Sequence, residues 1–304
     1  MKAFVFPGQG SQFVGMAKDL YDNFQSVRNL YEKAHAILGF DLAQISFNGP
    51  EEELKQTRVT QPAIFVHSIA VLEVLSEYKK EMKPDMVAGH SLGEYSALLT
   101  AGAFTFDQGL MLVKVRAELM QKAGEINPGT MAAVIGLEAK TLQQICQEVT
   151  QGVVQVANIN SPGQLVISGE IQAVNQAMEL AKNRGARRVI PLPVSGAFHS
   201  PLMAFAYDGF KNALDETSIN DATLPVYSNV TAQPVTKAGE IKDLLSRQLT
   251  HPVRWVEIIE NMIRDGANEF YEIGPGNVLS GLIKRINRQV NIKSIGTLKD
   301  IEEV

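Results

Sequence analysis

The stretch Gly89-His90-Ser91-Leu92-Gly93-Glu94 decides the fold that this chain can adopt. It follows a short apolar segment, Met86 to Ala88, and precedes an apolar run from Tyr95 to Ala103. A strand, a serine between glycines and a helix-forming segment predict a nucleophile elbow, which exposes a serine hydroxyl at a helix N-terminus. Small residues are needed there because the strand and the helix approach closely. The same pattern also occurs in non-catalytic turns, so other residues must decide the function.

Composition sets the class of protein. With 304 residues, 45% of them hydrophobic, and a net charge of −5, the chain is typical of a globular protein with a large core. The acidic balance argues against nucleic-acid binding. We find neither a leader nor an apolar run of the roughly 18 residues that a membrane span needs, which predicts a soluble cytoplasmic protein. The single cysteine, Cys146, excludes an intrachain disulfide and is interpreted as a packing residue.

Strands and helices alternate along most of the chain, which predicts a mostly parallel sheet with helices on both faces. Between Met131 and Leu192 the order becomes strand-helix-strand-strand-helix-strand, as in the ferredoxin-like motif, and Pro and Gly residues bracket the segment. We therefore expect an α/β-hydrolase-like catalytic domain made of residues 1–126 and 194–304. A ferredoxin-like (βαββαβ) subdomain, residues 127–193, would be inserted into it.

A second glycine-rich turn, Pro7 to Gln12, joins the first apolar strand to a helix that is expected from Phe13 to Phe24. It is a poor match to a dinucleotide-binding motif, because Phe13 stands where the third glycine belongs and no acidic residue closes a second strand about 20 residues later. Such a turn can instead present a free backbone N–H to an anion. The sequence favours Gln12 for that role.

Two residues far from Ser91 in the sequence could act with it. His199 lies in a loop downstream of the serine, as hydrolase chain order requires, whereas the other histidines lie in helices, beside the serine or before a proline. No two histidines have metal-ligand spacing. Arg116 lies on an apolar flank of a helix, so its guanidinium needs a partner. These residues alone leave open a structural ion pair, a snorkelling side chain or a contact with an acidic substrate.

Motifs along the whole chain resemble those of the malonyl-CoA:acyl-carrier-protein transacylase family. In order they are Phe6 to Gln12, Gly89 to Glu94, Asn160 to Gln164, Ala197 to His199, Gln248 with Pro252 to Trp255, and Gly274 to Gly276. Agreement between separate motifs is far more specific than the elbow alone. The resemblance implies that an acyltransferase moves a malonyl group from malonyl-CoA to the phosphopantetheine thiol of holo acyl carrier protein. The reaction would pass through a malonyl-serine, in ping-pong order, and supply extender units for fatty-acid or polyketide synthesis.

The resemblance also implies roles for the site residues. Ser91 would be the nucleophile, and His199 would accept its proton and later protonate the departing thiol. The backbone N–H groups of Gln12 and Leu92 would bind the oxyanion. Arg116 would bind the malonyl carboxylate through two parallel hydrogen bonds.

Three further residues receive roles in the same way. The backbone carbonyl of Gln248 would orient His199, so that the site is a dyad without an acid. We hypothesise that such an imidazole activates water poorly and that Gln248→Asp would raise hydrolysis. Asn160 would lie near the acyl group or its thiol arm. Phe198 would crowd a branched acyl α-carbon and so favour malonyl over methylmalonyl groups.

The resemblance implies two partners, malonyl-CoA and acyl carrier protein, and a monomeric chain without a bound cofactor or metal. Because carrier proteins of this family are acidic, we expect a basic patch to contact the carrier or the phosphates of coenzyme A. The two candidate patches are Lys182, Arg184, Arg187 and Arg188, and Lys284, Arg285 and Arg288.

Two other functions remain open at this point. A serine thioesterase would use the same serine and histidine but pass the acyl group to water; Arg116 and the missing acid partner count against it. A non-catalytic module that only docks a carrier protein is a third possibility. The intact Ser91 and His199 count against that.

Overall fold

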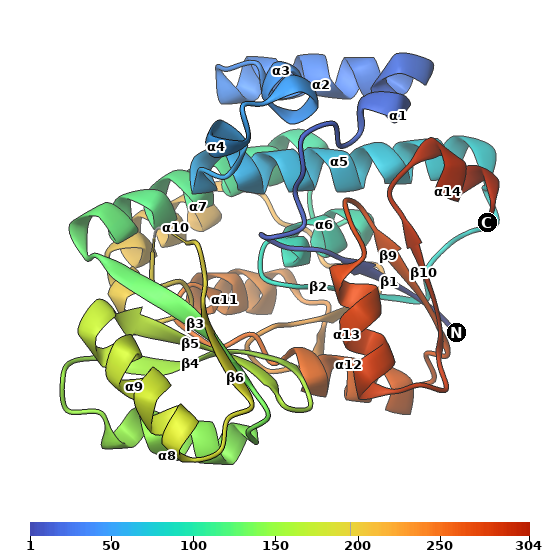
Figure 1. The fold of residues 1–304 in the computed structure, drawn as a ribbon. Helices are drawn as coiled ribbons and strands as arrows, with labels where there is room; N and C mark the ends of the chain where they lie inside the picture. Colours follow the sequence, from blue (N-terminus) through green and yellow to red (C-terminus); the bar gives the residue numbers. More distant parts are fainter. Residues whose placement is uncertain (195) are drawn as a thin grey trace.

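A six-stranded sheet organises the computed structural model, which describes residues 1–194 and 196–304 (Figure 1). The strands are β1 (Lys2–Phe6), β2 (Met86–Gly89), β7 (Val226–Tyr227), β8 (Pro234–Val235), β9 (Glu269–Ile273) and β10 (Asn291–Ile295). Their order is β10-β9-β1-β2-β7-β8, and β8 alone runs antiparallel to its neighbour. Because Phe6 of β1 lies opposite Gly89 of β2, the turns that follow these two strands leave the sheet side by side.

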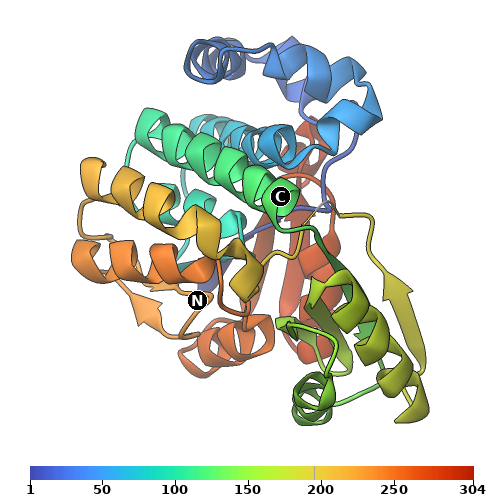
Figure 2. The same cartoon turned by 90° about the vertical axis from the view of Figure 1, so that its left-hand side faces the viewer.

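Helices cover both faces of this sheet, because alternate residues of its central strands point to opposite sides. Phe4, Phe6 and Val87 join a large core on one face, whereas Val5 and Ala88 join a smaller core with α12 and α13. Figure 2 shows α7, α10 and α11 side by side on the first face. The helices around this sheet are α1 (Lys18–Asn23), α2 (Gln25–Leu38), α3 (Leu42–Asn48), α4 (Glu51–Leu54), α5 (Thr57–Tyr78), α6 (Gly93–Thr100), α7 (Phe106–Ile126), α10 (Phe205–Glu216), α11 (Ala238–Gln248), α12 (Trp255–Arg264), α13 (Val278–Ile286) and α14 (Leu298–Glu302).

Helix α5 has the length and mean hydropathy of a membrane span, although no uninterrupted apolar run was found in the sequence. Within the described residues it is the one helix that passes this test, and 83% of its most apolar window is buried inside the fold. It packs beside α7 and beneath α2 (Figure 1). Its apolar surface is therefore accounted for by neighbouring helices.

A four-stranded antiparallel sheet, built from a continuous segment, lies at one end of the larger one (Figure 1). Its elements are β3 (Gly129–Ile135), α8 (Ala139–Glu148), β4 (Val154–Ser161), β5 (Gln164–Glu170), α9 (Ile171–Asn183) and β6 (Arg188–Pro191). The strand order β4-β5-β3-β6, with α8 and α9 packed on one core, is ferredoxin-like. The predicted fold class, an α/β-hydrolase-like core with a ferredoxin-like subdomain, is confirmed. Cys146 packs against this small core, and burial raises the pKa of its thiol to about 12.

The structure differs from the sequence-based prediction at several element ends. The helix expected from Phe13 begins at Lys18, because Gly15 and Ala17 adopt left-handed backbone conformations with φ of 99° and 62°. Helix α7 is capped by Thr105 in a capping box with Gln108. Strand β10 and helix α14 were not predicted.

Candidate active site

The elbow joins β2 to α6 and holds Ser91 in a left-handed conformation, with φ of 52°. A Cβ on Gly89 would lie 1.8 Å from the carbonyl carbon of Gly93, and a Cβ on Gly93 would lie 2.0 Å from the carbonyl oxygen of Phe6. Asn229 stabilises the turn: its Oδ1 accepts from the Ser91 N–H at 2.6 Å, and its Nδ2 donates to the Gly89 carbonyl at 2.7 Å. Because of the short distances at Gly89 and Gly93, neither position has room for a side chain.

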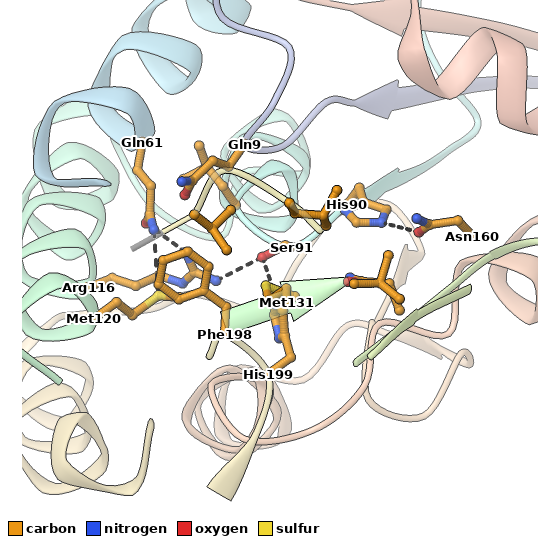
Figure 3. Close-up of a pocket in the computed structure, with 15 residues that line it drawn as sticks. Gln9, Gln61, His90, Ser91, Arg116, Met120, Met131, Asn160, Phe198 and His199 are labelled. Atoms are coloured by element: carbon orange, nitrogen blue, oxygen red, sulfur yellow. Dashed lines mark hydrogen bonds between the residues drawn. The ribbon is translucent and has the colours of Figure 1, made fainter. Parts of the chain in front are cut away.

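Ser91 and His199 lie within hydrogen-bond distance, with 2.8 Å between Oγ and Nε2 (Figure 3). The loop before the 3₁₀ turn η1 (Pro201–Ala204) carries His199, whose Nδ1 lies 2.9 Å from the carbonyl oxygen of Gln248. Burial, reinforced by the charge of Arg116, lowers the pKa of the imidazole to about 3. A neutral ring whose Nδ1–H donates to a carbonyl has Nε2 free to accept the serine proton.

Arg116 of α7 is completely buried, and its guanidinium reaches the nucleophile. Its Nη2 donates to Ser91 Oγ at 3.1 Å and to Gln248 Oε1 at 2.9 Å, and its Nη1 donates to Gln61 Oε1 at 2.6 Å. The Tyr95 ring lies 5.4 Å from the guanidinium. In the described part of the chain no carboxylate oxygen lies within 4.0 Å of it, and Nε has no partner. The described residues therefore form no direct ion pair with Arg116, and its guanidinium faces the serine without a carboxylate in contact.

A cavity of about 170 Å³ opens beside these groups, with walls from both sheets (Figure 3). Ser91 and Arg116 come from the six-stranded part, whereas Met131 and Asn160 come from the four-stranded sheet. Phe198, next to the base, lies against the cavity and is almost completely buried. The cavity therefore presents a nucleophile, a neutral base, a cation and a largely apolar wall to one small ligand.

Of the two predicted oxyanion donors, Leu92 lies at the cavity and Gln12 does not. Leu92 lies at the N-terminus of α6 against the cavity, and its N–H makes no hydrogen bond to any described residue. Gln12 does not line the cavity, and its side chain accepts a hydrogen bond from the Gly10 N–H at 2.8 Å. Gln9 lines the cavity instead. The prediction of Gln12 is therefore corrected to Gln9.

The geometry of the first turn explains this correction. The Ser11 N–H and hydroxyl both donate to the Gly8 carbonyl, at 3.3 Å and 2.7 Å, so the chain folds back tightly over these residues. A Cβ on Gly8 would lie 2.4 Å from the His90 carbonyl oxygen, so this arm of the turn touches the elbow. Gln9 lies at the tip of the turn, and Gln12 lies beyond it.

The predicted residue Asn160 reaches the cavity together with His90. The Nε2 of His90 lies 2.9 Å from Asn160 Oδ1, and its ring lies 5.5 Å from that of Trp255. Burial lowers the pKa of His90, so the ring is neutral. This hydrogen bond joins the elbow to β4 of the small sheet and makes both residues part of the cavity wall (Figure 3).

Two of the remaining histidines have structural contacts, whereas His35 is exposed on α2. His67 of α5 lies 2.7 Å from the Gly296 carbonyl oxygen, and burial lowers its pKa to about 4. His251 lies 2.8 Å from the Arg247 carbonyl at the end of α11. Among residues 1–194 and 196–304 no group of three or more His, Cys, Asp or Glu side chains could hold a metal ion.

Comparison with known proteins identifies the family. A family model for the acyl transferase domain matches residues 3–300. The chain belongs to the acyl transferase family. It is 47% identical over 302 residues to a malonyl CoA-acyl carrier protein transacylase of Bacillus subtilis, covering 99% of this chain and 95% of that protein. A relative from Staphylococcus aureus with the same name is 42% identical, with 99% and 97% covered.

Solved structures of relatives agree with this acyl transferase over its whole length. The acyl-carrier-protein-S-malonyltransferase of Bartonella henselae has a TM-score of 0.96 at 43% identity, covering 99% of this chain and 97% of that one. A malonyl-transacylase in complex with its holo type II PKS acyl-carrier protein has a TM-score of 0.96 at 41% identity, with the same coverage.

Three residues of the acyl transferase site were missed in the sequence. Gln61 and Asn229 lie far from the elbow in the chain and carried no local signal. Glu94 gave no distinctive signal either, because an acidic residue in the first turn of a helix is the ordinary preference of the helix dipole. Burial raises the pKa of its carboxyl to about 7, although hydrogen bonds from Gln248 and the Asn229 N–H oppose the shift.

The side chain of Gln248 changes one hypothesis about the acyl transferase. Its backbone carbonyl contacts His199 as the resemblance implied, but its amide contacts Arg116 and Glu94. An aspartate at this position would put its carboxylate toward the arginine and not toward the imidazole. The geometry therefore does not support Gln248→Asp as a way to polarise the base.

Proposed function

We propose that this acyl transferase moves a malonyl group from malonyl-CoA to the phosphopantetheine thiol of holo acyl carrier protein through a malonyl-Ser91 intermediate. The observation that carries the proposal is the buried Arg116. Its guanidinium donates to the oxygen of the nucleophile at 3.1 Å, and its other hydrogen-bond partners among the described residues are neutral amide oxygens. An acyl group that ends in a carboxylate supplies the missing negative charge. The printed names of the relatives agree with this substrate.

In the first half-reaction Ser91 Oγ attacks the thioester carbonyl while His199 Nε2 takes its proton. The Gln248 carbonyl, 2.9 Å from Nδ1, keeps the ring in the required orientation. The oxyanion is bound by the backbone N–H groups of Leu92 and Gln9. Collapse of the intermediate breaks the C–S bond, and the proton on His199 goes to the sulfur of coenzyme A.

The second half-reaction runs the same steps with a different thiol. The phosphopantetheine thiol of the carrier gives its proton to His199 and attacks the malonyl ester, and Ser91 Oγ recovers a proton as it leaves. During both steps Arg116 binds the malonyl carboxylate. Phe198 restricts space beside the acyl α-carbon, and Asn160 contacts the acyl group or its thiol arm.

Other features of the molecule belong to the same proposal. The chain uses no bound cofactor: coenzyme A arrives with the donor, and phosphopantetheine arrives on the carrier. It acts as a monomer in the cytoplasm. The catalytic domain consists of residues 1–126 and 194–304, and residues 127–193 form the inserted subdomain. The product feeds fatty-acid or polyketide assembly.

Intact-mass measurement tests the function directly. The protein is mixed with malonyl-CoA, quenched in acid and weighed, in parallel with Ser91→Ala. We expect one malonyl adduct on the parent protein only, and its discharge by added holo carrier protein. Free malonate without an adduct would support a thioesterase. No adduct and no turnover would contradict the catalytic proposal.

A further inference from the structure

The side-chain amide of Gln248 lies between a buried cation and a buried acid. Its Oε1 accepts from Arg116 Nη2 at 2.9 Å, and its Nε2 donates to Glu94 Oε2 at 2.7 Å and to the Ser91 carbonyl at 3.0 Å. Gln248 and Arg116 are completely buried, and Glu94 is 2% exposed. One amide therefore contacts the carboxylate-binding cation, the nucleophile's backbone and the nearest buried carboxyl group.

Chemistry fixes the orientation of this amide. A guanidinium can only donate hydrogen bonds, so it must face the amide oxygen, and the carboxylate oxygen of Glu94 must face the amide nitrogen. The reverse orientation would place two donors together and two acceptors together. Glu94 is held in turn by the Asn229 N–H at 3.2 Å. The acid thus determines where the oxygen that holds Arg116 lies.

Neutral partners also keep the charge of Arg116 available. Gln61 and Gln248 hold both terminal nitrogens through amide oxygens, at 2.6 Å and 2.9 Å. A carboxylate in direct contact would position the guanidinium equally well, but it would neutralise the charge and compete with an acidic acyl group. Gln248 occupies the place where Glu94 could otherwise make that contact.

We propose that the Gln248 side chain, oriented by Glu94, is a positioning residue that sets the preference for acyl groups ending in a carboxylate. It holds Arg116 in place and separates it from Glu94, so the cation stays free for the substrate. This inference rests on the proposed function and adds a role that the backbone carbonyl of Gln248 does not supply.

Substitution of the amide separates this role from orientation of the base. Gln248→Met retains the backbone carbonyl that contacts His199 but loses all three side-chain hydrogen bonds. We expect kcat/KM for self-acylation by malonyl-CoA to fall about 30- to 100-fold, as loss of a hydrogen bond to a charged group predicts. The value for acetyl-CoA, whose acyl group has no carboxylate, should fall far less. Gln143→Met, at an exposed position on α8, is the matched control and should change neither value.

Gln248→Glu tests the charge argument in the opposite way. It retains an oxygen beside Arg116 but makes it anionic, so kcat/KM should again fall more with malonyl-CoA than with acetyl-CoA.

A double variant tests whether Gln248 and Arg116 act together. Gln248→Met combined with Arg116→Met should be no less active with malonyl-CoA than Arg116→Met alone, because the amide acts through the guanidinium.

An equal fall of kcat/KM with malonyl-CoA and with acetyl-CoA would overturn the inference. Additive losses of kcat/KM in the double variant would overturn it as well. If Gln248→Met fails to fold, Gln248→Met with Glu94→Gln removes the unpaired buried charge and is measured in its place; thermal unfolding distinguishes the cases. Failure of the proposed function gives a different result, because the parent protein would then form no malonyl adduct at all.

Discussion

The two sheets contribute different things to the site. The six-stranded sheet and its helices supply Ser91, His199 and Arg116, from an elbow, a loop and a neighbouring helix. The four-stranded sheet supplies wall residues such as Met131 and Asn160. A parallel sheet gathers the loops after its strands at one edge, where groups distant in sequence can meet. The comparison indicates that the larger part carries out the chemistry and the smaller part shapes the cavity.

One contact crosses this division and reaches the base itself. Gln155 of β4 donates through Nε2 to the carbonyl of His199 at 2.6 Å and to that of Thr250 at 3.1 Å. His199 has a left-handed backbone, with φ of 58°, so the loop needs such support. The small sheet therefore helps to position the base without providing a reacting atom.

The largest expected effect lies in the elbow of the larger part. In Gly93→Ala the new Cβ would lie 2.0 Å from the Phe6 carbonyl oxygen, so β1 and α6 must separate. We expect a loss of about 4 kcal/mol or more in the free energy of unfolding, measured by urea denaturation. Gly281→Ala on α13, where a Cβ meets nothing within 4 Å, is the control and should not destabilise the protein. Equal stability of the two variants would contradict the steric argument.

Replacement of the base should abolish most activity without unfolding the protein. We expect His199→Asn to reduce the rate of malonyl-Ser91 formation about 10³-fold, within the range for loss of general-base catalysis, as followed by intact mass. His90→Asn changes the other histidine beside Ser91 and removes only a wall contact with Asn160, so its effect should be much smaller. Similar losses of rate in both variants would contradict the assignment of His199, and not His90, as the base.

A change in the small sheet should affect the base indirectly. Gln155→Met removes the two hydrogen bonds that hold the His199 and Thr250 carbonyls. We expect kcat to fall about 10-fold while KM for malonyl-CoA changes little, because loss of these bonds is worth roughly 1–2 kcal/mol. Steady-state kinetics check this, with Gln144→Met on the exposed face of α8 as the control. A change in KM alone would place Gln155 in the cavity wall instead.

The smallest change in stability is expected on the helices that cover the small sheet. Arg184 and Glu148 form an ion pair at 2.8 Å, with their side chains 44% and 45% exposed. Arg184→Ala should change stability by less than about 1 kcal/mol, because exposed pairs are screened by water. Thermal unfolding measures it. If carrier-dependent transfer falls while self-acylation is unchanged, the predicted contact of this basic patch with the carrier gains support.

Local patterns in the sequence were enough to predict the architecture and the central residues. The elbow needs glycines on both sides of Ser91 whatever surrounds it, and the strand and helix periodicities of residues 127–193 specify the ferredoxin-like order locally. Chain order and an apolar helix flank pointed to His199 and Arg116, and the resemblance to a family then supplied their roles and the Gln248 carbonyl. Element ends were less certain, as at Phe13, because left-handed residues such as Ala17 carry no sequence signal.

The partners of those residues depended on the tertiary structure. The register of β1 against β2 brings Gln9, not Gln12, to the elbow. The packing of α5, α7 and α11 surrounds Arg116 with amide oxygens and leaves it without a carboxylate in the described chain. Such contacts join residues up to 132 positions apart, and no local pattern encodes them. The sequence by itself predicted which groups would react, and only the folded chain decided what holds them, because burial and hydrogen bonding are non-local.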